Sequence, residues 1–152
     1  MERIQTIERL REIMGQPLPT VPKKIHRQLN AKAIEFIQKS PLMFISTSDA
    51  KGRSTVAPKG DPAGFVQVVS STTLRIPERK GNRLLMSLQN LLANDQIGLV
   101  FIVPGTSELF RVHGRCSIFF DDGLCANHSA RGKSALLVMQ VEIEECFFHC
   151  GK

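Results

Sequence analysis

A run of basic residues around one glycine is the first feature of this sequence that could do chemistry. Arg79, Lys80, Gly81, Asn82 and Arg83 lie where a β-prone segment gives way to a helical pattern. A helix N-terminus leaves backbone N–H groups unpaired and carries partial positive charge, so it binds phosphate readily, and an arginine adds bidentate hydrogen bonds. The run therefore predicts a phosphate site. The alternative is that Asn82 only caps the helix and the cations are solvated.

A second candidate is a strand that runs into a loop rich in glycine and proline, residues 54–64 (Ser-Thr-Val-Ala-Pro-Lys-Gly-Asp-Pro-Ala-Gly). The amides and carbonyls at a strand end point in fixed directions, which suits recognition of a flat heteroaromatic ring by its polar edge. Lys59 adds a positive charge beside them. The alternative is that Pro58 and Pro62 only end the strand and Lys59 faces solvent.

Other arrangements of reactive side chains are weaker. The sequence shows no Ser-His-Asp pattern, so no catalytic residue is predicted. Cys146, His149 and Cys150 are close in sequence, but on a strand residue 149 points away from residues 146 and 150, and no Cys-x-x-Cys pair completes a zinc site. We therefore expect no metal site, and we expect His113 to be a packed or hydrogen-bonded residue of a strand.

The helical elements that must position these residues follow from apolar spacing. Apolar residues at intervals of three to four predict a helix over residues 4–14, a second from Asn30 to Ser40, and a third between Asn82 and Asn94. Residues 16–22 contain three prolines and predict an extended linker. A separate N-terminal segment, residues 1–29, is therefore expected before the main domain, residues 30–152.

The rest of the chain predicts a mainly β fold. Short β-prone runs separated by turn residues cover residues 42–47, 53–57, 65–69, 73–76, 97–103, 108–120 and 136–148. Within the run 108–120, Gly114 is expected to mark a bulge or a close backbone approach. Six or seven antiparallel strands with one inserted helix predict a small closed or partly open β-barrel.

Composition and charge limit the function. The chain has 152 residues, 42% of them hydrophobic and 22% charged, which predicts one soluble domain. No apolar run reaches membrane-spanning length, and the N-terminal residues lack the apolar region and the cleavage site of a signal peptide, so we expect a cytoplasmic protein with four free thiols. A net charge of +6 suits an anionic partner, but the nine Phe residues lie mostly in apolar runs, which disfavours nucleic acid.

The order of these segments resembles the FMN-binding split-barrel proteins related to pyridoxamine 5′-phosphate oxidase. The resemblance covers about residues 30–152 and is carried by residues 54–61, by Gly81-Asn82-Arg83, by Leu88-Gln89-Asn90 with Ala93-Asn94, by residues 97–101, and by Arg111-Val112-His113-Gly114-Arg115. Residues 147–152 resemble the C-terminal signature of one subgroup of flavoproteins in this family. The fold implied is a split antiparallel β-barrel of Greek-key type with flanking helices.

The resemblance also implies a cofactor site. Thr55, Val56, Ala57 and Pro58 would line the isoalloxazine ring through the backbone, and Lys59 would reach its pyrimidine edge or the phosphate. Asn82 and Arg83 would hold the phosphate. Arg111 would belong to the same site, and the flavin would lie between the subunits of a homodimer.

Two positions depart from the pattern of the family's oxidases: Ser54 and Leu84 stand where those enzymes have an arginine and a lysine for the phosphate. Related proteins also continue past the position of Lys152 with a segment that helps to enclose the site. The oxidase activity of those enzymes is therefore not implied. From the resemblance as a whole we expect an FMN-dependent oxidoreductase that acts on an unidentified small molecule. The alternatives are FAD, a deazaflavin or haem as cofactor, and a non-enzymatic binder of flavin or of another anionic heterocycle that acts as a sensor or store.

Overall fold

The structure is a computed structural model that describes residues 1–17 and 24–150. These residues form helices α1 (Ile7–Met14), α2 (Ala31–Lys39), α3 (Met86–Ala93) and α4 (Asp122–Asn127), and strands β1 (Leu42–Ser48), β2 (Ser54–Gly60), β3 (Gln67–Val68), β4 (Thr73–Glu78), β5 (Gln96–Ile102), β6 (Glu108–Phe119) and β7 (Leu137–Cys150). The strands make one sheet in the order β2-β1-β5-β6-β7-β4-β3, and all the pairings are antiparallel.

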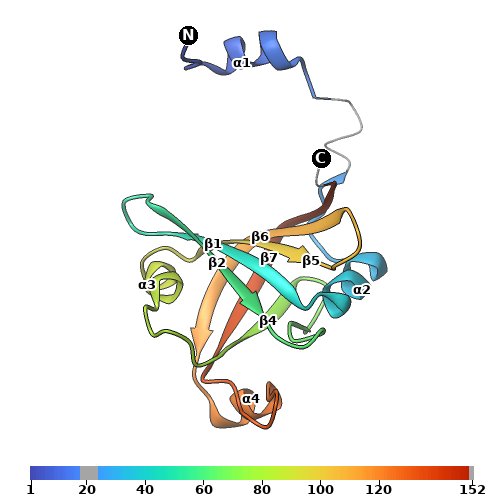
Figure 1. Cartoon of the computed structure of the whole chain (residues 1–152), viewed down its shortest axis with the longest axis vertical. Coiled ribbons are helices and arrows are strands. Elements are labelled where there is room, and N and C mark those ends of the chain that lie inside the picture. The colour runs from blue at the N-terminus through green and yellow to red at the C-terminus, as the bar shows by residue number, and fades with distance from the viewer. Residues whose placement is uncertain (18–23, 151–152) are drawn as a thin grey trace.

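The sheet curls into a barrel. β2 is the first strand of the sheet and β4 is the sixth, yet the side chains of Lys59 on β2 and Glu78 on β4 form an ion pair. Figure 1 shows the same closure, with β2 and β4 side by side below β1. The prediction of a split antiparallel β-barrel is confirmed.

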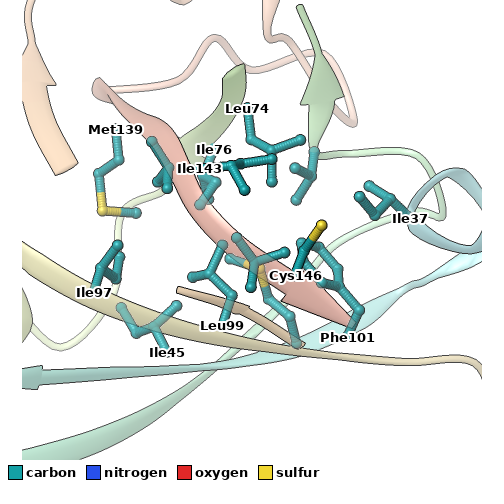
Figure 2. Close-up of a cluster of buried hydrophobic side chains, with 14 of the residues drawn as sticks. Ile37, Ile45, Leu74, Ile76, Ile97, Leu99, Phe101, Met139, Ile143 and Cys146 are labelled. Atoms are coloured by element: carbon teal, nitrogen blue, oxygen red, sulfur yellow. The ribbon is translucent and has the colours of Figure 1, made fainter. Parts of the chain in front are cut away.

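One apolar core fills the barrel. Inward residues alternate with outward ones along β1, β5 and β6, as in a sheet with one face solvated. Figure 2 shows Ile45, Leu99 and Phe101 facing Leu74, Ile76 and Met139 across this core, and all six side chains are at most 1% exposed. A packed interior leaves the outer face of the sheet as the surface on which a ligand could lie.

Helix α2 closes one end of the barrel. Its boundaries are those that the sequence predicts, because Asn30 Oδ1 accepts a hydrogen bond from the backbone N–H of Ala33 at 2.9 Å and Ser40 follows the last turn. Its buried face consists of Ala33, Phe36 and Ile37. The ring of Phe36 packs edge-on against that of Phe148 on β7 at 5.5 Å between centroids.

A β-bulge interrupts the pairing of β6 with β7. His113 lies opposite Glu145, but Gly114 lies opposite Ile143, so Glu144 is an extra residue on β7. At Gly114 an added Cβ would lie less than 3.0 Å from the backbone carbonyl oxygen of Glu142. Both predictions for Gly114, a bulge and a close backbone approach, are confirmed.

Other elements differ from the sequence prediction. β3 is limited to Gln67–Val68, shorter than the predicted run 65–69. Helix α4 was not predicted, because it has only 6 residues and no apolar period. It is instead held by its cap, since Asp121 Oδ1 accepts from the N–H of Leu124 at 2.7 Å. Much of the proline-rich linker lies outside the described residues.

Helix α1 is amphipathic, as predicted, and ends at Gly15 with φ of 80°. None of its residues is buried, and Figure 1 shows it apart from the barrel. None of the helices in the described part of the chain has the length and apolar character needed to cross a membrane.

Candidate functional site

Strand β2 presents alternate members of residues 54–59, the predicted cofactor segment, to opposite sides. Ser54, Val56 and Pro58 are exposed, whereas Thr55, Ala57 and Lys59 are half-buried. Val56 is 68% exposed although it is apolar. Because β2 is an edge strand, one side of its backbone also has no ladder partner within the sheet. The segment thus offers an apolar surface and free backbone polar groups together.

The sheet register carries this exposed surface across the barrel. Val56 pairs with Ser46, Ser46 with Gly98, Gly98 with His113, and His113 with Glu145. None of these five residues is buried. The second and third residues of the row are small, since Ser46 has a short side chain and Gly98 has none. The outer face therefore has a shallow depression at Ser46 and Gly98, between the larger side chains of Val56 and His113. We call this depression the floor.

A pocket of about 1170 Å³ lies on this floor. Its lining is mostly polar and consists of Ile25, Arg27, Ser46, Thr47, Ser48, Ser54, Gln96, Ile97, Gly98, His113, Ile143, Glu144 and Glu145. We call it the outer-face pocket. It is open to solvent, and its volume is at the upper end of the range of small-molecule sites.

Lys59 points away from this pocket. Its ammonium group forms an ion pair with Glu78, and the two side chains are only 17% and 19% exposed. Arg79 makes a second link beside it, donating from Nε to Asp61 Oδ2 at 2.8 Å. Both cations are therefore paired with carboxylates of this chain. They lie beside a smaller cavity of about 180 Å³, which is lined by the ends of β2 and β4.

The segment with Asn82 and Arg83 is a loop and not the first turn of a helix. The sequence predicts a helix beginning near Asn82, but α3 begins at Met86. The cause is local: Asn82 Oδ1 accepts from the N–H of Leu84 at 3.0 Å, and Arg83 and Leu85 have left-handed φ values of 64° and 56°. Asn82 thus caps a turn that precedes the helix.

This loop is nevertheless suited to an anion. Arg83 is exposed, and it forms no salt bridge within the described part of the chain. The N-cap residue of α3, Leu85, makes no side-chain hydrogen bond to the first turn, so the first backbone N–H groups of the helix lack a side-chain cap. Left-handed backbone at two residues other than glycine is also a form of strain that accumulates at ligand sites.

A buried polar network ties α3 to the cofactor segment. Asn90 Nδ2 donates to Thr47 Oγ1 at 3.1 Å and to Thr55 Oγ1 at 3.0 Å, and the two hydroxyls lie 3.0 Å apart. Asn90 is 9% exposed and Thr47 is 3% exposed. Sequence reasoning did not assign these roles, although a lone Asn within a leucine-rich helix is a signal for such a network. The network fixes the position of α3 relative to β1 and β2.

Arg111 lies on the outer face with a group of side chains that the sequence did not connect. Its Nη2 lies 3.3 Å from Nε2 of His113, and its guanidinium lies 5.0 Å from the centroid of the Phe147 ring. His113 Nδ1 in turn lies 2.6 Å from Glu145 Oε1. His113 is thus hydrogen-bonded, as predicted, but the pairing with Glu145 depends on the bulge and was missed.

Two of the buried cysteines, Cys116 and Cys146, are poor nucleophiles. Burial raises the pKa of the Cys116 thiol to about 12, and the carboxylate of Asp95 acts in the same direction. Burial also raises the pKa of Cys146. Both thiols therefore stay protonated at neutral pH. All four cysteines are free, as predicted. Within the described residues no group of three or more His, Cys, Asp or Glu side chains is placed to hold a metal ion.

The predicted site residues thus fall into two groups. Ser54, Val56, Pro58 and Arg111 share the outer face of the sheet, since Pro58 and Arg111 belong to one row through Phe44 and Val100. Lys59 lies beside residues 78–81, which lead to Asn82 and Arg83. Thr55 and Ala57 join the two groups along β2.

Comparison with protein families gives one match. The family model described as pyridoxamine 5′-phosphate oxidase matches residues 29–150, which is most of the chain and includes every predicted site residue. No curated protein matches the chain.

Solved structures share the fold at low sequence identity. HupZ of Group A Streptococcus has a TM-score of 0.64 and 18% identity, over 79% of this chain and 93% of that chain. An FMN-binding protein of Syntrophomonas wolfei has a TM-score of 0.56 and 12% identity, over 93% and 92% of the two chains. HutZ of Vibrio cholerae, a heme storage protein, has a TM-score of 0.52 and 14% identity, over 81% and 94%. At these identities the likeness shows the fold alone.

Proposed function

The chain belongs to the pyridoxamine 5′-phosphate oxidase family, and from that premise we propose that it is an FMN-dependent oxidoreductase acting on a small molecule, with the flavin at the interface of a homodimer. The family membership and the split barrel support flavin binding. The FMN-binding protein of Syntrophomonas wolfei has the same fold. The redox activity, the choice of FMN and the dimer are parts of the proposal.

One observation carries the proposal: the cofactor segment of β2 exposes Val56 at the edge of a low polar floor. Val56 is 68% exposed, and the row that continues through Ser46 and Gly98 has small side chains. A flat ring could lie against this surface while its polar edge meets the free backbone groups of an edge strand. The exposure of the floor is also what an interface with a second copy of the chain would cover.

The residues of the chain fit a flavin phosphate. Arg83 would bind the phosphate with its guanidinium, and the uncapped first turn of α3 would donate backbone hydrogen bonds. Asn82 keeps the turn in shape through its bond to the N–H of Leu84, and its side-chain amide nitrogen remains available. Ser54 would supply a hydroxyl in place of the arginine found in oxidases of the family.

Orientation and charge are the other contributions of the chain. A bound flavin supplies two-electron redox chemistry, and the protein binds, orients and tunes it. Thr55, Val56, Ala57 and Pro58 would hold the ring through the backbone, and the bond from Asn90 fixes Thr55. Arg111 would place a positive charge near the ring, which favours the reduced, anionic form. Lys59 would do so only if it exchanged its partner Glu78 for the ligand.

A second candidate is a binding or storage protein without turnover. The heme storage protein HutZ has the same fold, and the outer-face pocket of about 1170 Å³ has room for a larger ring system. This candidate shares the location of the site with the first. It differs in the ligand and in the absence of a redox cycle.

The test is the visible absorption spectrum of the purified full-length protein. The chain has no Trp and no Tyr, so its own near-ultraviolet absorbance is small and a bound chromophore dominates. We expect the two bands of oxidised flavin, release of FMN on denaturation, and bleaching by a chemical reductant followed by recovery in air. A Soret band would support the second candidate instead.

If the protein is colourless, FMN is titrated into it and quenching of flavin fluorescence is followed. Saturable quenching in the wild type, weakened in Arg83→Ala, supports the proposal. No quenching at millimolar protein contradicts flavin binding. Sedimentation with and without FMN then tests whether the flavin-bound form is a dimer.

A further inference from the structure

His113 has a defined tautomer, because its two neighbours are chemically opposite. Glu145 offers a carboxylate oxygen, which accepts hydrogen bonds, and it lies 2.6 Å from Nδ1. Arg111 offers a guanidinium, which only donates, and its Nη2 lies 3.3 Å from Nε2. The arrangement that satisfies both has a proton on Nδ1 and a lone pair on Nε2. In that arrangement His113 accepts from Arg111 and donates to Glu145.

The two contacts of His113 differ in strength. The 2.6 Å contact to Glu145 is short for a charge-assisted hydrogen bond, whereas the 3.3 Å contact to Arg111 is long. The guanidinium of Arg111 rests on the ring of Phe147, and the bond to His113 is its only side-chain hydrogen bond among the described residues. An incoming oxyanion can therefore outcompete Nε2 of His113 for this guanidinium.

The site opens into the outer-face pocket. His113 and Glu145 line that pocket, and Arg111, which is not part of the lining, contacts the lining residue His113. The other charged groups that line it are Arg27 and Glu144, and Glu144 already accepts from Arg115 Nε at 3.0 Å. Arg27 is thus the arginine of the pocket lining, and Arg111 is the cation in contact with His113, whose other partner is Glu145.

We propose that Arg111, His113 and Glu145 form a proton-coupled anion site in the outer-face pocket, which binds a small carboxylate or phosphate. Arg111 turns to the oxyanion and leaves Nε2 of His113 free. His113 then takes up one proton on Nε2 from solvent or from the bound molecule, while its Nδ1–H stays on Glu145. The site therefore gains one proton for each anion bound, and the new positive charge on the imidazole lies beside that anion.

The inference deepens the proposed function and rests on it for the identity of the substrate. An oxidoreductase that takes two electrons from a substrate also needs a group that accepts the accompanying proton. The row Val56, Ser46, Gly98, His113 places His113 on the same face as the proposed ring surface. The substrate class that this site recognises is a small molecule with an oxyanion next to an exchangeable proton.

The test uses the full-length protein without added flavin, and oxalate as the probe, because its planar dianion matches a guanidinium. Calorimetric titrations in two buffers of different ionisation enthalpy measure both the affinity and the number of protons taken up. We expect wild type to bind oxalate with net proton uptake near neutral pH. Arg111→Gln should weaken oxalate roughly tenfold or more, the effect of losing a hydrogen bond between charged groups.

The variant His113→Gln tests whether the proton taken up on oxalate binding goes to His113. Gln keeps a polar side chain but cannot become a cation beside the anion, so we expect no proton uptake and an oxalate affinity about three- to tenfold below that of wild type. The control is His149→Gln, an exposed histidine of the same strand outside the outer-face pocket, which should behave as wild type. Proton uptake that persists in His113→Gln, or the failure of millimolar oxalate to bind to wild type, would overturn the inference.

A direct readout of the tautomer supports the calorimetry. Long-range ¹H–¹⁵N NMR spectra of the imidazole should show the Nδ1–H form in the free protein and the imidazolium with oxalate. An Nε2–H form in the free protein contradicts the proposal. Because these measurements need no flavin, they are independent of FMN titration: a protein that binds oxalate with proton uptake but never binds FMN would refute the proposed function and leave this site intact.

Discussion

The side-chain amide of Asn90, on helix α3, donates a 3.0 Å hydrogen bond to the hydroxyl of Thr55, the second residue of the predicted cofactor segment. Thr55 also shares a hydrogen bond with Thr47, so one amide organises two strands and a helix. These hydrogen bonds hold the first turn of α3, which has the uncapped backbone N–H groups, at a fixed distance from β2, which would contact the flavin ring.

Asn90→Ala is expected to reduce stability and FMN affinity together. Losing a buried amide that makes two hydrogen bonds costs about 2 kcal/mol. Urea unfolding and FMN titration measure the two effects. The control is Gln89→Ala, an exposed neighbour on the same helix, for which we expect a change of about 0.5 kcal/mol or less. A destabilised Asn90→Ala protein with unchanged FMN affinity would show that the network is only structural.

Arg83→Ala is expected to weaken FMN binding roughly tenfold with little change in stability, since the side chain is exposed and lies in a loop. Riboflavin, which lacks the phosphate, should bind to both proteins with similar affinity. This comparison assigns the loss to the phosphate. Lys39→Ala, which removes an exposed cation at the end of α2, serves as the control for net charge. Equal loss in both variants would indicate a general electrostatic effect.

Lys59 and Glu78 provide a test of whether this lysine serves the ligand or the barrel. Lys59→Ala leaves a mostly buried carboxylate without its partner, so we expect a loss of about 3 kcal/mol in unfolding free energy. It should also lower FMN affinity or the flavin reduction potential. Glu78→Gln frees the ammonium group and should tighten FMN binding. If neither variant changes FMN affinity or potential, Lys59 has no part in the site.

Gly114→Ala is expected to be strongly destabilising, by about 3 kcal/mol, because the new methyl group would collide with the backbone carbonyl of Glu142. The matched control is Gly98→Ala, also in a strand of the barrel, where a Cβ would meet Ser46 Cβ at 3.5 Å and His113 Cδ2 at 3.6 Å. Those are ordinary contacts, so a change below about 1 kcal/mol is expected. Similar urea midpoints for the two variants would contradict the close approach.

Cys116 should make the protein less stable at alkaline pH. Burial raises its pKa from 9.0 to about 12, so the unfolded chain releases the proton first. Its stabilising contribution is complete below pH 9 and falls by up to about 1.4 kcal/mol per pH unit until pH passes the folded value. Unfolding free energies at pH 8 and pH 10.5 should differ less in Cys116→Ala than in wild type. Equal differences would contradict this account.

Much of the architecture could be predicted from the sequence because it is local. The Asn30 cap, the apolar face of α2 and the β-prone runs can be recognised from residues that are neighbours in the sequence. A glycine within a strand, such as Gly114, indicates that another backbone segment approaches closely. The segments of the candidate site come from the family resemblance, and their role in binding a cofactor stays a prediction. The placement of Lys59 opposite Glu78 could not be predicted, because that ion pair joins the two ends of a curled sheet.

Two further features could not be predicted because they depend on backbone dihedral angles at single residues and on the register of two strands. The leucines of residues 84–92 recur at helical spacing, but left-handed backbone at Arg83 and Leu85 delays the helix to Met86. The partnership of His113 with Glu145 depends on the register of two strands after a bulge. Periodicity in one segment carries no information about such a register.

The bulge on β7 divides that strand into two halves of opposite phase. Before it, Met139, Val141 and Ile143 face the core, and after it Cys146 is buried and Phe148 packs on Phe36 and Phe110, while Glu145 faces out. Glu144 and Glu145 therefore both stand outside the core, between the inward residues Ile143 and Cys146. Deletion of Glu144 would leave Ile143 opposite Gly114 and Glu145 opposite His113 as consecutive pairs, so the ladder would become regular and the remaining residues would keep their faces. The extra residue is thus not needed for the alternation of this strand. It supplies an outward carboxylate that accepts from Arg115 and the local twist that a bulge gives a strand.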